Sequence, residues 1–133
     1  MKRTVSILVL FWFCLTAEAQ NKYFEIFTDS AALKKFGWNH NINICTAYLT
    51  GFLAGSVVRK KGVDFGVLDI GNNIHSKGGR IYAALKGVVD AGLSVAHDPS
   101  VFPSEDRLAG KHIGDKIFAE MNSVKEKIAQ EGK

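Results

Sequence analysis

Residues 46–92 read TAYLTGFLAGSVVRKKGVDFGVLDIGNNIHSKGGRIYAALKGVVDAG, and this stretch predicts the fold. Apolar side chains recur at helical spacing over residues 46–61, so we expect a helix there that ends at Gly62. The segments that follow indicate a short apolar strand, a polar glycine-rich loop and a second amphipathic helix, at residues 63–70, 71–79 and 80–90. The order helix, strand, helix predicts an α/β layer.

Two glycines, Gly51 and Gly55, lie one turn apart on the first of these helices. Glycine lowers helix propensity, but it lets another backbone approach closely. We therefore expect this helix to pack against the sheet at the two glycines.

The flanking sequence adds shorter elements. Their predicted positions are a strand at 23–27, a helix at 30–36 capped by Asp29 or Ser30 and ended by Gly37, a polar loop at 38–44, a turn at Asp98 and Pro99, a helix opened by residues 103–106 with a Ser104 cap, and a C-terminal helix at 115–130.

The composition is that of one folded domain. The chain has 133 residues, of which 47% are hydrophobic and 23% charged. The net charge of +4 is uneven, because residues 1–86 carry 11 Lys and Arg against 5 acids, whereas residues 87–133 carry 6 against 8. This balance favours an anionic partner for the first two thirds, although such an excess also occurs in proteins that bind nothing acidic.

The two cysteines and four histidines indicate no metal site and no cofactor. Cys14 and Cys45 form no CxxC or Cys/His pattern, and the histidines are too scattered to pair on one helix. We expect both cysteines to be buried apolar thiols.

The loop at residues 71–80 carries the most chemistry. It joins the end of a strand to the start of a helix, where free amides and the helix dipole favour a phosphate. Its order of residues is not that of a nucleotide P-loop or a dinucleotide-binding turn. A surface turn that needs glycines with positive φ remains the alternative. The candidate binding residues are Asn72, Asn73, His75, Ser76, Lys77, Gly79 and Arg80.

Other charged residues are weaker candidates. The run from Arg59 through Lys60 to Lys61 suits a solvated helix end, yet it and Lys86 could contact the phosphate backbone of an anionic partner. Asp69 and His75 could suggest acid–base catalysis, but no Ser or Cys is placed to act as nucleophile. We expect Asp69 to fix the adjacent loop, and we expect Tyr48, Phe52 and Tyr82 to be core residues.

A resemblance to a known family rests on collinear segments over residues 29–113. They are FGW (36–38), AYLTG (47–51), LAG (53–55), GV (62–63), VLDIG (67–71), RIYAALKG (80–87), DAGL (90–93), PSEDR (103–107) and HI (112–113). Their order and spacing resemble the universal 5S-rRNA-binding ribosomal protein eighteen of the large subunit, in its archaeal and eukaryotic branch.

The resemblance implies a single compact α/β domain, a mixed sheet packed by helices, with C-terminal helices. It implies a structural protein rather than an enzyme, located on cytoplasmic ribosomes, that helps to seat 5S rRNA in the central protuberance. The implied partners are 5S rRNA, large-subunit rRNA and neighbouring ribosomal proteins, with no small-molecule substrate. The loop at 72–80 would face the RNA.

The N-terminus departs from the family. Members begin with a basic arm and antiparallel strands, whereas residues 1–22 here form an apolar segment that precedes the ribosomal domain at 23–133. Residues 1–20 have the charges, apolar run and AEA site of a secretory signal. A small exported protein that retains this domain as a binding module is therefore the alternative. We favour a miscalled start or a strand with no membrane contact, and expect residues 4–13 to pair beside residues 67–70.

Overall fold

The computed structural model describes residues 14–16, 30–41 and 43–131. Three predictions lie outside the described residues. They are the strand at 4–13, the strand at 23–27 and the domain boundary between residues 22 and 23. The expected single α/β domain with C-terminal helices is confirmed. Within the described part, no helix is both long and apolar enough to cross a membrane.

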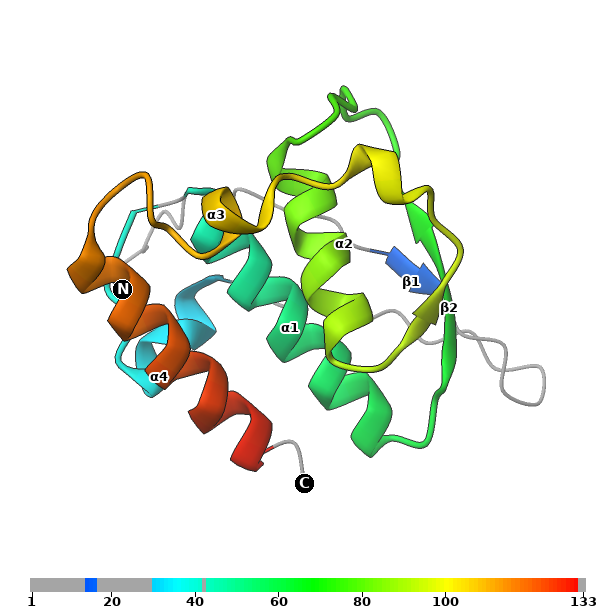
Figure 1. The fold of residues 1–133 in the computed structure, drawn as a ribbon. Helices are drawn as coiled ribbons and strands as arrows, with labels where there is room; N and C mark the ends of the chain where they lie inside the picture. Colours follow the sequence, from blue (N-terminus) through cyan, green and yellow to red (C-terminus); the bar gives the residue numbers. More distant parts are fainter. Residues whose placement is uncertain (1–13, 17–29, 42, 132–133) are drawn as a thin grey trace, which may run out of the picture.

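Two helices form the centre of the molecule, α1 (Ile44–Lys60) and α2 (Arg80–Asp90). Both were expected at nearly these bounds. Helix α1 begins where the Asn43 side chain accepts a hydrogen bond from the Thr46 amide at 2.8 Å, and it ends before Gly62, whose φ is +78°. The two helices pack side by side (Figure 1).

Glycines bring the two helices into close contact, which corrects the expectation that Gly51 and Gly55 face the sheet. A Cβ atom at Gly51 would lie 1.9 Å from the Ala84 carbonyl oxygen of α2, and one at Gly55 would lie 2.9 Å from that of Val88. Gly87 of α2 makes an equally close contact with α1, because a Cβ there would lie 2.1 Å from the Tyr48 carbonyl oxygen. Matched glycines on both helices favour this approach.

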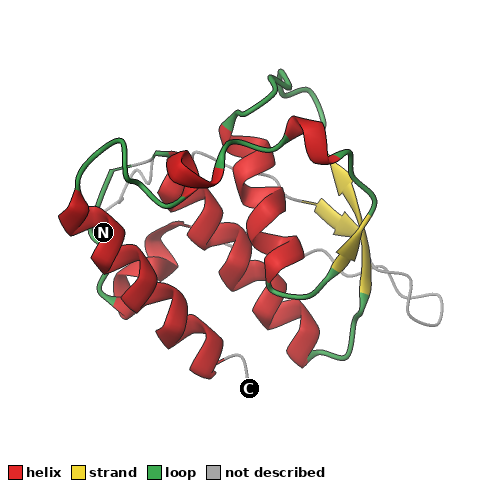
Figure 2. Ribbon diagram, in the orientation of Figure 1, coloured by secondary structure: helices red, strands yellow, loops and turns green. Residues whose placement is uncertain are grey.

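The sheet is mixed, as the family resemblance implies. Strand β1 (Cys14–Thr16) pairs antiparallel with β2 (Phe65–Asp69), with Leu15 opposite Leu68. Strand β2 pairs in parallel with β3 (Ser94–Val95), and α2 forms the crossover between them (Figure 2).

The remaining elements are short except for the last helix. They are the 3-10 helices η1 (Ser30–Phe36) and η2 (Pro99–Val101), and the α-helices α3 (Glu105–Leu108) and α4 (Asp115–Glu131). The expected helix positions are confirmed, but the first is a 3-10 helix. Ser104 occupies the capping position of α3, but the prediction that its side chain caps the helix is wrong, since that side chain makes no capping hydrogen bond.

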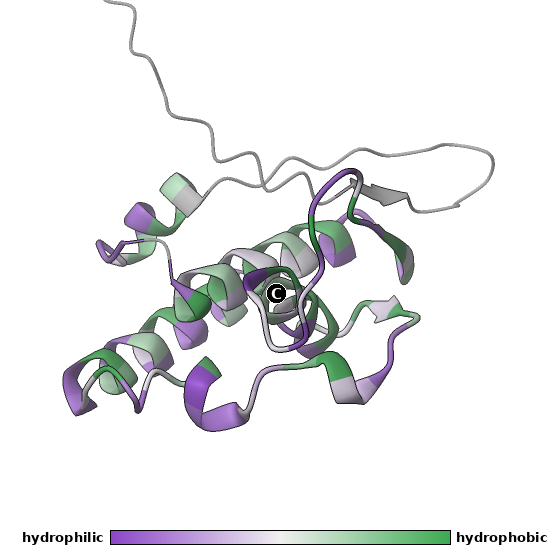
Figure 3. Ribbon diagram, turned by 90° about the horizontal axis from the view of Figure 1, so that it is seen from above, coloured by the Kyte–Doolittle hydropathy of each residue, from purple (hydrophilic) through white to green (hydrophobic). Residues whose placement is uncertain are grey.

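The core lies on both sides of the central helices. On one side, residues of η1, α1, α3 and α4 pack together, including the expected core residues Tyr48 and Phe52. On the other side, the sheet and α2 enclose Val58, Leu85 and Val88, and Tyr82 packs against them. Green and purple segments alternate along the helices in Figure 3, as expected for helices with one buried face.

Candidate nucleic-acid interface

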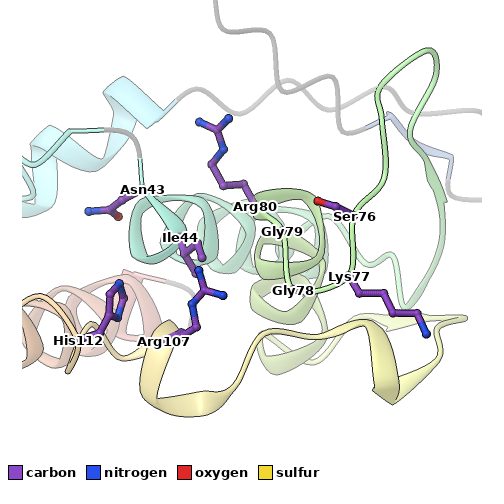
Figure 4. A pocket seen from close by; sticks show the side chains of 9 residues that line it. All are labelled: Asn43, Ile44, Ser76, Lys77, Gly78, Gly79, Arg80, Arg107 and His112. Carbon is purple, nitrogen blue, oxygen red and sulfur yellow. The ribbon is translucent and has the colours of Figure 1, made fainter.

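A hollow of about 600 Å³ opens where α1 and α2 begin. Its walls come from four segments: the start of α1, the loop before α2, the first residue of α2, and the region around α3 (Figure 4). The lining residues are Asn43, Ile44, Ser76, Lys77, Gly78, Gly79, Arg80, Arg107 and His112. None of them is acidic, so the hollow suits an anion.

Hydrogen bonds within the chain hold the loop before α2 in place. The Asp69 carboxylate accepts from the Gly71 amide at 2.8 Å, which confirms its expected role in fixing the loop. The Asn73 side chain donates to the Ile70 carbonyl oxygen at 2.9 Å. At the other end of the loop, the Gly78 amide donates to the Val101 carbonyl oxygen at 2.9 Å. The loop is therefore anchored at both ends.

The N-terminus of α2 is open to an anion. Gly79 occupies the capping position and has no side chain to bond the first-turn amides, and no acidic residue lies in that turn. Gly78 adopts a φ of +71°, a conformation that favours glycine. Uncapped amides together with the helix dipole attract negative charge to this point.

Two of the residues that line the hollow are arginines. Within the described part of the chain, neither the Arg80 nor the Arg107 guanidinium has a hydrogen-bond or ion-pair partner. Asp69, the acid that precedes the loop, bonds the Gly71 amide and not Arg80. The two guanidinium groups come from different elements (Figure 4). Each guanidinium group can therefore donate two hydrogen bonds to an incoming phosphate.

Lys77 differs from the arginines, because it has an acid nearby, Asp98. The Lys77 and Arg80 side chains extend in different directions, both away from Arg107 and His112 (Figure 4). Hydrogen bonds from Ser100 are the main cause that lowers the pKa of Asp98, and the charge of Lys77 lowers it further. Asp98 therefore offsets part of the positive charge of Lys77.

Buried contacts fix the walls of the hollow. The Cys45 thiol donates to the Arg107 carbonyl oxygen across 3.6 Å, which ties α1 to α3. Burial raises the pKa of this thiol, so Cys45 is the buried apolar group that the sequence predicted. The sequence indicated no metal site. Within the described ranges, no three His, Cys, Asp or Glu side chains lie close enough together to hold a metal ion.

Comparison with known proteins identifies the family. No family model matches the chain. The chain is 46% identical to the large ribosomal subunit protein uL18 of Korarchaeum cryptofilum over 77% of its own length, and 46% identical to that of Methanococcoides burtonii over the same share. It is also 40% identical to uL18 of Methanothrix thermoacetophila, covering 86% of this chain and 70% of the relative. The chain belongs to the uL18 family.

The uL18 match confirms the resemblance drawn from residues 29–113. The chain spans 49% and 62% of the first two relatives, which are longer proteins. All three relatives are named as large ribosomal subunit proteins.

The hollow of this uL18-family chain brings together part of the predicted site. Ser76, Lys77, Gly79 and Arg80 line it, whereas Asn72, Asn73 and His75 lie outside the lining on the exposed loop.

The weaker candidates lie elsewhere. Arg59, Lys60 and Lys61 are at the opposite end of α1, about 24 Å along the helix axis. The Lys86 ammonium pairs with the Asp90 carboxylate at 2.6 Å, and the other carboxylate oxygen accepts from the Tyr48 hydroxyl at 2.7 Å. Burial first, and then Asp90, raise the pKa of Tyr48. Lys86 is thus engaged within the fold.

Sequence reasoning missed five lining residues, Asn43, Ile44, Gly78, Arg107 and His112. Arg107 and His112 stand in two of the segments that carry the family resemblance, so a signal for them was present. Asn43 could have been found as the residue that caps α1.

Proposed function

We propose that this chain is a structural constituent of the large ribosomal subunit that binds 5S rRNA through the hollow and the loop before α2, and so helps to seat this RNA in the central protuberance. Large-subunit rRNA and neighbouring ribosomal proteins are its further partners. The observation that carries the proposal is that the Arg80 and Arg107 guanidinium groups have no partner among the described residues and line a hollow without acids.

The hollow offers complementary contacts to an RNA phosphate. The open amides at the start of α2 can donate to one oxygen, and the Arg80 guanidinium can donate to two. Asn43 and Ser76 add polar groups at the rim. Phosphate contacts of this kind hold an RNA in register, and recognition of particular bases falls to the exposed loop.

The experiment is a titration of the full chain with 5S rRNA and with a structured RNA of equal length, at several salt concentrations. We expect tighter binding to 5S rRNA, with an affinity that falls as salt rises because counterions are released. Equal affinity for both RNAs would leave only a non-specific cation surface and contradict the proposal.

Cell fractionation tests the ribosomal role separately. We expect the chain to sediment with large subunits, with Met1 or Lys2 at its mature N-terminus. A protein found outside the cell without residues 1–19 would favour the exported binding module that the signal-like start suggests.

A further inference from the structure

Ile74 is the most exposed of the large apolar side chains in the described part of the chain. Its exposure is 91%, whereas Val67, next in order, is 50% exposed. Single exposed apolar residues are common on protein surfaces. Ile74 is unusual because it lies within the loop that forms one wall of the hollow, three residues after Gly71 and two before Ser76.

The loop presents Ile74 from anchored backbone. Asp69 bonds the Gly71 amide, the Asn73 side chain bonds the Ile70 carbonyl, and the Gly78 amide bonds the Val101 carbonyl. An apolar side chain on a held loop can be buried by a ligand with little further loss of backbone entropy.

The charges around Ile74 indicate what kind of ligand buries it. No acidic residue occurs between Asp69 and Asp90, while Lys77 and Arg80 follow Ile74 closely. Asp98 offsets Lys77 in part, but Arg80 is unpartnered within the described residues. An apolar group beside free cations matches RNA, in which flat apolar base faces alternate with phosphates.

We infer that Ile74 packs on the face of an unstacked RNA base while Arg80 holds a neighbouring phosphate. This inference rests on the proposed function and assigns a separate contact to it, one that is apolar and independent of salt. In other protein–nucleic acid complexes, aliphatic side chains insert between bases and pack against their faces.

The test compares Ile74→Ala and Ile74→Leu in the full chain, with 5S rRNA as the probe. We expect Ile74→Ala to weaken binding by about fivefold, the loss from removing part of a buried aliphatic side chain. The dependence on salt stays unchanged because no charge is removed. Ile74→Leu keeps most of the affinity. The matched control is Val57→Ala on α1, where the side chain is 38% exposed and outside the hollow, and it should bind as the unchanged protein does.

Three results would overturn the inference, and they are distinguishable. If the unchanged chain fails to bind 5S rRNA, the proposed function fails and the base contact with it. If the unchanged chain binds and Ile74→Ala binds equally well, only the base contact fails. If Ile74→Ala binds RNA normally but no longer sediments with large subunits, Ile74 contacts a protein instead.

Discussion

The two ends of α2 differ in what they contact. At its start, Gly79 leaves the first-turn amides uncapped and Arg80 is exposed without a partner in the described structure. About two to three turns later, Gly87 is buried against the Tyr48 backbone of α1, and Asp90 binds both Tyr48 and Lys86. Helix α2 thus begins with uncapped amides and ends in contact with α1.

This difference predicts that the packed end of α2 determines folding stability, whereas the start of α2 determines RNA binding. Contacts between the helices are already complete in the isolated protein, so changes there should act on the free energy of unfolding. The Arg80 and Arg107 guanidinium groups have no partner among the described residues, so changes to them should act on RNA affinity and leave folding nearly intact. Each prediction below tests whether the two regions are as independent as this comparison requires.

The largest effect is expected for Gly51→Ala. The added Cβ would lie 1.9 Å from the Ala84 carbonyl oxygen, so the helices must move apart. We expect the free energy of unfolding to fall by about 3 kcal/mol or more, at the upper end for overpacked interiors. Urea denaturation measures this, with Val57→Ala on the exposed side of α1 as control. A loss below about 1 kcal/mol would mean that the helix contact is looser than the structure shows.

A smaller loss is expected for Tyr48→Phe. This change removes the 2.7 Å hydrogen bond to Asp90 and keeps the buried ring, so we expect a loss of about 1 kcal/mol in the free energy of unfolding. Tyr82→Phe is the matched control, because within the described residues its hydroxyl has no hydrogen-bond partner. RNA affinity should not change in either variant. A drop in affinity for Tyr48→Phe alone would show that the two ends of α2 are coupled.

The smallest effect concerns α4, which the His40–Glu120 pair joins to the segment before α1 at 2.5 Å. The hydrogen bond from His40 lowers the pKa of Glu120. Stability from this lowered pKa is complete above the usual Glu pKa and is lost as pH falls through the lowered value. We expect Glu120→Gln to lower the urea midpoint slightly near neutral pH, and the difference to vanish in acid. Glu126→Gln, an exposed site on the same helix, should show neither effect.

Local patterns in the sequence predicted the elements well, but not what they contact. Helix α2 was expected at residues 80–90 because glycines stand at both ends, and the structure has those bounds. Gly51 and Gly55 signalled a close approach, yet their spacing does not tell a helix from a sheet as the partner. The capping of α3 also depends on a side-chain rotamer that residue type alone does not fix.

The candidate site was half predicted for a related reason. Ser76, Lys77, Gly79 and Arg80 are neighbours in sequence, so a single loop revealed them. Arg107 and Asn43 come from elements more than 25 residues away on either side, and only the packing of α1 against both α2 and α3 brings them to the hollow. That Arg80 has no ion-pair partner in the described part of the chain likewise became visible only in three dimensions.

The most direct measurement compares Arg80→Ala with Arg59→Ala, which removes the same charge at the far end of α1. Both are titrated with 5S rRNA over a range of salt, and both are unfolded in urea. For Arg80→Ala we predict a loss of about 1 to 3 kcal/mol in binding, a salt slope smaller by about one, and nearly unchanged stability. Arg59→Ala should change the affinity far less. Unchanged affinity with lowered stability for Arg80→Ala would make Arg80 a structural residue and contradict the separation of binding from packing along α2.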